Sequence, residues 1–205
     1  MKMLVVDDHT VVREGLRRLL SAFLDVTIVE ASCSREAVSL FRAESPDVVL
    51  LDINLPGFGG LDLLRRLLLM EPKARVLMLT MHVSPIYVAR ALEAGAQGYV
   101  SKGAKADELI EAVRVVAGGG RYIEHEIASE LALSLTSAGD ATKDLSAREL
   151  DIMRLLAQGK NMNGISQDLG ISYKTVANIC TAIKQKMMVE NTSELIKLAV
   201  EMHRS

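Results

Sequence analysis

The chain has 205 residues, of which 49% are hydrophobic and 24% charged, and its formal net charge is −2. This length allows one large or two small domains, and the composition is ordinary for a soluble protein. No apolar run reaches the roughly 20 residues that span a bilayer. The opening MKMLVVDD places carboxylates where a signal peptide needs its apolar centre, so the sequence predicts a cytoplasmic protein without membrane contact. Cys33 and Cys180 lie far apart and fit no metal or disulfide pattern.

Short apolar runs alternate with helical patterns in the first part of the chain. Strands are predicted at residues 3–6, 26–29, 47–53, 76–80 and 97–100. Helices are predicted at residues 9–22, 61–70, 84–94 and 105–116, with another that begins with Ser34 as its N-cap. This alternation predicts a doubly wound α/β fold, a five-stranded parallel sheet with helices on both faces.

The pattern changes after Ala117. A glycine run, a short helix near residues 127–135 and a Ser/Thr/Gly/Asp stretch follow, and beyond them every pattern is helical. The sequence therefore predicts an α/β domain over residues 1–118, a linker over 119–143 and a small all-α domain over 144–205.

Polar side chains follow the predicted strands at their carboxyl ends. Asp7 and Asp8 follow the first strand, Asp52 ends the third, Thr80 ends the fourth and Lys102 follows the fifth. Because ligands bind beyond the carboxyl ends of parallel strands, we expect these side chains to share a site. Three carboxylates repel one another unless a cation binds, and oxygen ligands suit Mg²⁺. A carboxylate beside Mg²⁺ can also act as a nucleophile and form an aspartyl phosphate, although Asp52 alone could equally be a cap or turn residue.

Four segments, VVDDH, LLDINLPGFGG, LMLTMH and GYVSKGA, resemble in order and spacing the motifs of bacterial two-component receiver domains, which have a flavodoxin-like fold. The resemblance implies that Asp52 is the phosphoacceptor. It implies that Asp7, Asp8, Asp52 and the backbone carbonyl of Asn54 hold Mg²⁺. It also implies that Lys102 pairs with the phosphoryl group, that Thr80 moves toward it and that Tyr99 turns inward. Phosphorylation by a histidine kinase or a small phosphodonor then adds about −1.5 to −2 charges and biases a two-state equilibrium.

The C-terminal helices begin with a capping box, in which Ser146 is followed by Glu149 three residues later. Two helices joined at Gly170 are typical of a helix-turn-helix. The helix that follows Ser172 places Val176, Ile179, Ile183 and Met187 on one face, and residues 171–189 contain three lysines and no acidic residue. Such a helix suits the major groove of DNA, although a merely soluble helix face has the same pattern.

LSARELDIMRLLAQGK, ISQDL, ISYKTVANI and IKQKM resemble the four-helix LuxR-type DNA-binding domain. Together with the receiver motifs they are similar to the NarL/FixJ group of response regulators, which are transcription factors rather than enzymes. The resemblance implies a homodimer on promoter DNA and two sets of contacts: bases by Ala177, Asn178 and Thr181, and phosphates by Lys174, Lys184 and Lys186.

The helical domain departs from the family pattern at Ala147, Gly164, Ser166, Ala177 and Ile179, and Gly164 in a helix interior costs up to about 1 kcal/mol. Residues 144–205 also hold eight Lys and Arg against seven Asp and Glu, so we expect weak DNA binding per monomer. Two alternatives stay open. The helical domain could bind a protein partner instead of DNA, or the chain could be a Mg²⁺-dependent phosphatase of the haloacid-dehalogenase type, although that type carries its nucleophilic Asp on the first strand.

Overall fold

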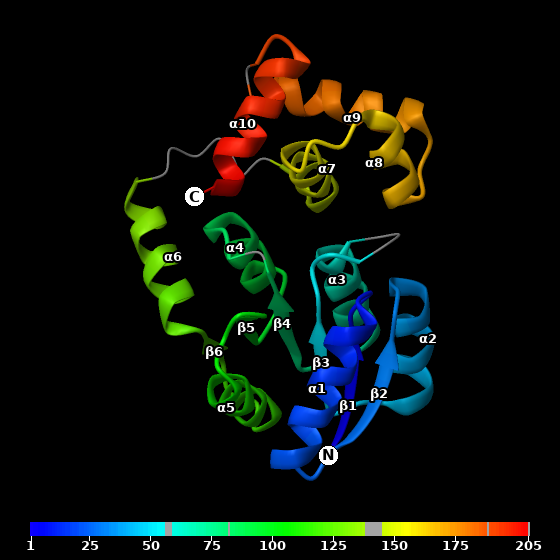
Figure 1. The fold of residues 1–205 in the computed structure, drawn as a ribbon, viewed down its shortest axis with the longest axis vertical. Helices are drawn as coiled ribbons and strands as arrows, with labels where there is room; N and C mark the ends of the chain where they lie inside the picture. Colours follow the sequence, from blue (N-terminus) through cyan, green and yellow to red (C-terminus); the bar gives the residue numbers. More distant parts are fainter. Residues whose placement is uncertain (56–58, 82, 138–144, 188, 205) are drawn as a thin grey trace.

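Six parallel strands form one sheet in the N-terminal part of the chain (Figure 1). The computed structural model describes residues 1–55, 59–81, 83–137, 145–187 and 189–204, so the expected loop residues 56–58 lie outside it. The sheet order is β2-β1-β3-β4-β5-β6, in which the first five strands have the flavodoxin-like arrangement. The strands are β1 (Lys2–Val6), β2 (Thr27–Ala31), β3 (Val48–Leu51), β4 (Val76–Thr80), β5 (Gly98–Ser101) and β6 (Tyr122–Ile123).

Helices cover both faces of this sheet, as the doubly wound prediction requires. Alternate residues of β3 point to opposite faces, so Val48 and Leu50 enter one core cluster, and Val49 and Leu51 enter the other. The first cluster packs under α1 (Thr10–Phe23) and α5 (Ala106–Ala117). The second packs under α2 (Ser34–Glu44), α3 (Gly60–Met70) and α4 (Pro85–Glu93). The predicted α/β architecture is confirmed.

Three local features differ from expectation. β6, which the sequence did not predict, pairs in parallel with β5 and lies within the segment expected to be a linker. It is followed by α6 (His125–Ser137), a longer helix than the one expected over residues 127–135. Ser34 is the first residue of α2 rather than its N-cap, because Cys33 takes the cap position. A strand of two residues carries too little periodicity to be recognised in sequence.

Four helices form the C-terminal domain: α7 (Ala147–Ala157), α8 (Met162–Leu169), α9 (Tyr173–Lys186) and α10 (Thr192–Arg204). The predicted capping box at Ser146 and Glu149 is present, and Ser172 accepts a hydrogen bond from the N–H of Thr175. Gly170 adopts φ 61° between α8 and α9, where a left-handed residue ends the first helix of the pair. Gly164 is the third residue of α8, where its N–H donates to Asn161, so it lies in the first turn and not in a helix interior.

The helical domain docks on the α/β domain through α7, which lies above α3 and α4 in Figure 1. The Tyr87 hydroxyl donates a 2.8 Å hydrogen bond to the carbonyl of Leu150. The carboxylate of Asp151 lies against Gly59, so close that a Cβ at that glycine would be 2.3 Å from it. No helix in the described ranges is both long and apolar enough to cross a bilayer.

Candidate functional site

The carboxyl ends of the central strands bring the predicted polar residues together. Asp7 and Asp52 follow β1 and β3 directly, and the N–H of Asp52 donates to the carbonyl of Val6 at 3.0 Å. On the other side, the N–H of Lys102 donates to the carbonyl of Thr80 at 2.9 Å. The backbone ladder of the sheet therefore fixes where these side chains begin, and the apolar strands below them remove solvent from one side.

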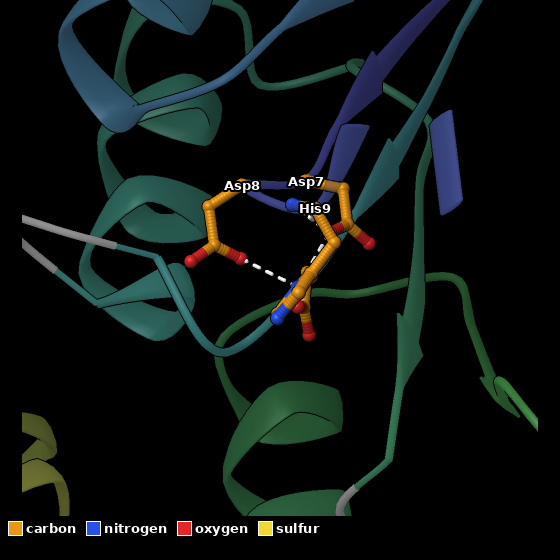
Figure 2. Close-up of side chains that lie close together, drawn as sticks. Asp7, Asp8 and His9 are labelled. Carbon is orange, nitrogen blue, oxygen red and sulfur yellow. Dashed lines mark hydrogen bonds and ion pairs between the residues drawn. The ribbon is translucent and has the colours of Figure 1, made fainter. Parts of the chain in front are cut away.

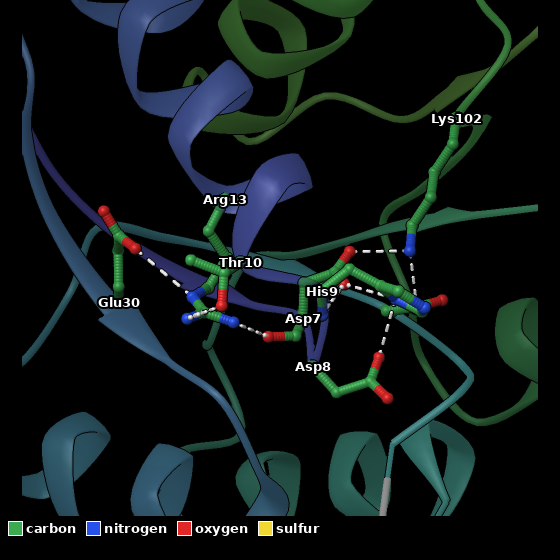
Figure 3. Close-up of polar contacts among 8 residues, drawn as sticks. Asp7, Asp8, His9, Thr10, Arg13, Glu30 and Lys102 are labelled. Atoms are coloured by element: carbon green, nitrogen blue, oxygen red, sulfur yellow. Dashed lines mark hydrogen bonds and ion pairs between the residues drawn. The ribbon is translucent and has the colours of Figure 1, made fainter.

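Lys102 joins the two buried carboxylates. Its ammonium nitrogen lies 2.6 Å from Asp7 Oδ2 and 2.7 Å from Asp52 Oδ2 (Figure 3 shows the lysine and Asp7). Burial raises the pKa of Asp52, and Lys102 offsets only part of that effect. Burial also works against the charged ammonium, but Asp52 and Asp7 outweigh it and raise the pKa of Lys102. The site therefore holds more negative than positive charge, and its side chains are largely shielded from water.

The imidazole of His9 lies beside the carboxylates of Asp7 and Asp8 (Figure 2). Its Nδ1 is 2.8 Å from Asp8 Oδ1 and 3.2 Å from Asp7 Oδ1, and its backbone N–H donates to Asp7 Oδ1 at 2.8 Å. Ligand atoms of Asp7, Asp8, His9 and Asp52 all lie within 4.8 Å of one another. One cation could therefore contact all four side chains.

Thr80, the last residue of β4, and Tyr99 in β5 are both fully buried. Burial, with smaller effects of Tyr87 and Asp52, raises the pKa of the Tyr99 phenol. The side chain of Asn54 is half-buried, and in the described part of the chain its Oδ1 accepts no hydrogen bond. Asp52 Oδ1 is likewise buried without a hydrogen-bond partner there. Buried oxygens of this kind suit a cation or a phosphoryl group.

The residues fit a hard divalent cation. Asp7, Asp8 and Asp52 offer carboxylate oxygens, and Asn54 lies beside them on the wall of an adjoining cavity with Asp8 and His9. Oxygen-rich sites of this charge are typical of Mg²⁺. The α/β domain therefore has an acidic pocket typical of magnesium binding.

α9 presents a polar face to solvent. Lys174, Asn178 and Thr181 are exposed, and Ala177 and Lys184 are half-exposed. Lys186 is also exposed but forms a 2.8 Å ion pair with Glu149 on α7. On the opposite side of the helix Val176, Cys180 and Ile183 are buried. Lys174, Asn178 and Thr181 therefore lie away from the buried face of α9, whereas Ala177 and Lys184 lie at its border.

Comparison with known proteins gives matches to two families. Residues 3–114 match the response regulator receiver domain, and residues 143–199 match the bacterial regulatory proteins of the luxR family. The chain is 39% identical to the response regulator UvrY of Escherichia coli K12 over 202 residues, 97% of this chain and 93% of that one. It is 38% identical to the response regulator GacA of Pseudomonas aeruginosa over 97% of this chain and 95% of that one.

The chain belongs to the NarL/FixJ family of response regulators. Two solved structures of response regulators are similar to this chain. A two-component response regulator of the LuxR family from Aurantimonas sp. SI85-9A1 matches with a TM-score of 0.64 and 38% identity, over 66% of this chain and 98% of that one. The RcsB–DNA complex matches with a TM-score of 0.63 and 25% identity, over 98% of both chains.

This response regulator thus combines a receiver, whose acidic phosphorylation pocket contains Asp7, Asp8 and Asp52, with a LuxR-type DNA-binding domain. The family acts in transcription regulation and is not catalytic, so the phosphatase alternative is excluded. A receiver domain also implies a histidine kinase as partner.

Several residues that show no functional signal in the sequence support the pocket of this response regulator. Arg13 donates to the carbonyl of Asp7 at 2.7 Å and pairs with Glu30 at 3.2 Å, which ties the end of β1 to α1 and β2 (Figure 3). Glu124, buried just after β6, accepts from the N–H of Ser101 at 2.7 Å and so holds the residue before Lys102. Neither role has a local signal, because each depends on a partner from a different element.

Proposed function

We propose that Asp52 is the phosphoacceptor of this response regulator. The observation that supports this most strongly is its position: a side chain only 1% exposed at the end of β3, with Oδ2 held by Lys102 and Oδ1 free of hydrogen bonds from the described residues. A carboxylate oxygen without a hydrogen bond keeps its lone pairs for attack on phosphorus, and the electron pair of the broken phosphorus bond leaves with the donor group.

Asp7, Asp8, Asp52 and the backbone carbonyl of Asn54 hold Mg²⁺ in this proposal. When bound, the cation supplies positive charge that neutralises the phosphoryl oxygens. The chain itself orients the phosphoryl group with Lys102, whose ammonium already lies within 2.7 Å of Asp52. The carboxylate of Asp7 holds the ammonium of Lys102 beside Asp52.

Thr80, Lys102 and Tyr99 form the switch. A phosphoryl group adds about −1.5 to −2 charges and three acceptor oxygens, so the hydroxyl of Thr80 and the ammonium of Lys102 gain a new partner. Lys102 then leaves Asp7 for the phosphoryl group, and the loops after β4 and β5 follow. Tyr99 is close enough to Tyr87 and to Asp52 for both to raise the pKa of its phenol, and Tyr87 contacts the DNA-binding domain. Phosphorylation thus biases the docking of α7 on the receiver.

In this proposal a histidine kinase or a small phosphodonor phosphorylates the protein in the cytoplasm. The phosphorylated protein then binds promoter DNA as a homodimer. Ala177, Asn178 and Thr181 on the outer face of α9 read bases, and Lys174, Lys184 and Lys186 contact phosphates. The exposure of this face supports the assignment, as does the similarity to RcsB, which binds DNA in its solved complex. A two-fold dimer reads paired half-sites.

Asp52→Asn tests the proposal. The full chain is incubated with a small phosphodonor and Mg²⁺, and its mass, its oligomeric state by light scattering and its salt-dependent gel shift on promoter-length DNA are recorded. We expect the wild type to gain one phosphoryl group, dimerise and bind DNA more tightly, and Asp52→Asn to do none of these. Full phosphate uptake by the variant contradicts the phosphoacceptor assignment.

One observation favours a second function for the helical domain. Residues 144–205 are nearly neutral, whereas DNA affinity depends on phosphate neutralisation. If Asp52 takes up phosphate but neither state of the chain shifts DNA, the domain binds a protein partner instead.

A further inference from the structure

A cavity of about 420 Å³ lies between the two domains, next to the acidic pocket. On the receiver its wall contains Asp8 and Asn54, which are also residues of the proposed cation site. On the helical domain its wall contains residues of α7 and α8, among them Arg154, Leu155 and Leu169. A small molecule that approaches the pocket through this cavity therefore contacts the DNA-binding domain.

Arg154 carries a buried positive charge that the described residues satisfy only in part. Its side chain is 7% exposed, and its Nε has no hydrogen-bond partner in the described part of the chain. The carboxylate of Asp151 is paired with it, but Nη2 and Oδ1 are 3.9 Å apart, which is too long for a hydrogen bond. A buried charged donor without a partner is costly. An anion bound in the cavity would remove this cost.

The other charged groups of the described cavity wall are already paired. Lys160 and Asp168 form an ion pair with each other at a partly exposed place. Asp8 lies 2.8 Å from Nδ1 of His9 and belongs to the proposed cation site. Arg154 is therefore the charged side chain on this wall that gains most from a bound anion.

The cavity wall also has an apolar part. Leu55, Leu155 and Leu169 line the cavity, and each is at most 4% exposed. Carbon atoms of an organic anion can pack on these leucines, whereas an inorganic anion has no apolar surface to bury there. A guanidinium group binds a carboxylate through two parallel hydrogen bonds. The wall thus suits a small organic carboxylate.

We propose that this cavity binds the leaving group of a small acyl phosphate and that Arg154 of the DNA-binding domain binds the carboxylate formed. The inference rests on the proposed role of Asp52 as phosphoacceptor and names the class of donor. An oxygen of Asp52 attacks phosphorus, and the bond from phosphorus to the acyl oxygen breaks. Its electron pair leaves with that oxygen, which becomes part of a carboxylate without any proton transfer. Arg154 neutralises the negative charge that grows on this leaving group.

Two donors with different leaving groups test this role. Acetyl phosphate releases acetate, whereas phosphoramidate releases ammonia, which offers a guanidinium no negative charge. The full chain with Mg²⁺ is incubated with each donor, and mass spectrometry gives the rate constant for phosphate uptake on Asp52. For Arg154→Gln we expect the rate constant to fall about ten-fold with acetyl phosphate and to change less than about two-fold with phosphoramidate.

The readout is the ratio of the two rate constants within one variant, because a smaller folded fraction lowers both equally. Arg154→Lys keeps the charge but not the planar fork, so we expect its ratio to lie between those of the wild type and Arg154→Gln. The matched control is Arg18→Gln, which changes an exposed arginine on α1 and should keep the wild-type ratio.

The possible failures are distinguishable. Uptake on Asp52 with the same donor ratio in wild type, Arg154→Gln and Arg154→Lys overturns the role of Arg154 and leaves the phosphoacceptor assignment intact. Uptake by the wild type at a residue other than Asp52 overturns that assignment and this inference together.

Discussion

At the scale of single residues, Lys102 decides whether the acidic pocket is stable. It places one ammonium at 2.6 Å from Asp7 and 2.7 Å from Asp52, and the side chains of both carboxylates are at most 2% exposed. Burial raises the pKa of Asp52 even with the lysine present. The lysine therefore stabilises two buried charges, and in the proposed mechanism it is the group that binds the phosphoryl oxygens.

Lys102→Met removes the ammonium and retains most of the apolar stem. We expect the free energy of unfolding in chelator at pH 7 to fall by about 3 kcal/mol, because two buried carboxylates lose their counter-ion. The loss becomes smaller as the pH falls through the raised pKa of Asp52, since one carboxyl is then protonated, and smaller when Mg²⁺ is added. Urea unfolding measures this loss of stability. The control is Lys73→Met, which replaces an exposed lysine. Equal stability of both variants contradicts this account.

At the scale of elements, α7 is a helix with two buried sides. Its capping box fixes the first turn, where Glu149 also binds Lys186 of α9 at 2.8 Å. Lys186 and the cap of Ser146 outweigh burial and lower the pKa of Glu149. The next residues, Leu150 and Asp151, face the receiver. α7 thus connects α9 to the receiver.

Tyr87→Phe removes the hydrogen bond between α4 and the Leu150 carbonyl and leaves the ring in place. We expect docking of the two domains to weaken by about 1 kcal/mol, which is about a five-fold rise in the undocked population. Hydrogen exchange at the amides of α3 and α7 measures that opening. Tyr122→Phe on β6, at the far edge of the sheet, serves as control. Identical exchange in all three proteins means that the hydrogen bond does not hold the domains together.

At the scale of the whole molecule, docking buries a charge. Asp151 is 2% exposed, and burial raises its pKa to about 6 despite Arg154 at 3.9 Å. Asp62 of α3 raises the pKa further, and Arg148 lowers it. If the undocked carboxyl has its ordinary pKa of 3.8, the docked form binds the proton more tightly. Docking is therefore favoured below pH 3.8 and loses that contribution as the pH rises through about 6.

The docked population should thus grow as the pH falls from 7 to 5, by a free energy of at most about 2 kcal/mol. In Asp151→Asn we expect this dependence to vanish and docking at pH 7 to strengthen, since the amide carries no charge. Small-angle scattering follows the change in dimensions across this range. Asp107→Asn on the exposed side of α5 is the control. A wild type whose dimensions do not change with pH contradicts the prediction.

The sequence alone determined the features that depend on local patterns. Alternating apolar runs specified the five main strands, and Ser146, Ser172 and Gly170 marked the helix ends of the second domain, because caps and periodicity are short-range. The grouping of Asp7, Asp8, Asp52 and Lys102 was also predictable, since parallel strands bring their carboxyl ends to one edge.

Tertiary structure decided the contacts between distant residues. Glu124 supports Ser101, Tyr87 binds Leu150, and Asp151 packs on Gly59, although 63 residues separate Tyr87 from Leu150. The turn of His9 onto the carboxylates depends on where the end of β1 lies against β3. Such contacts carry no periodic signal, because they arise only when separately formed elements pack together and exclude water between them.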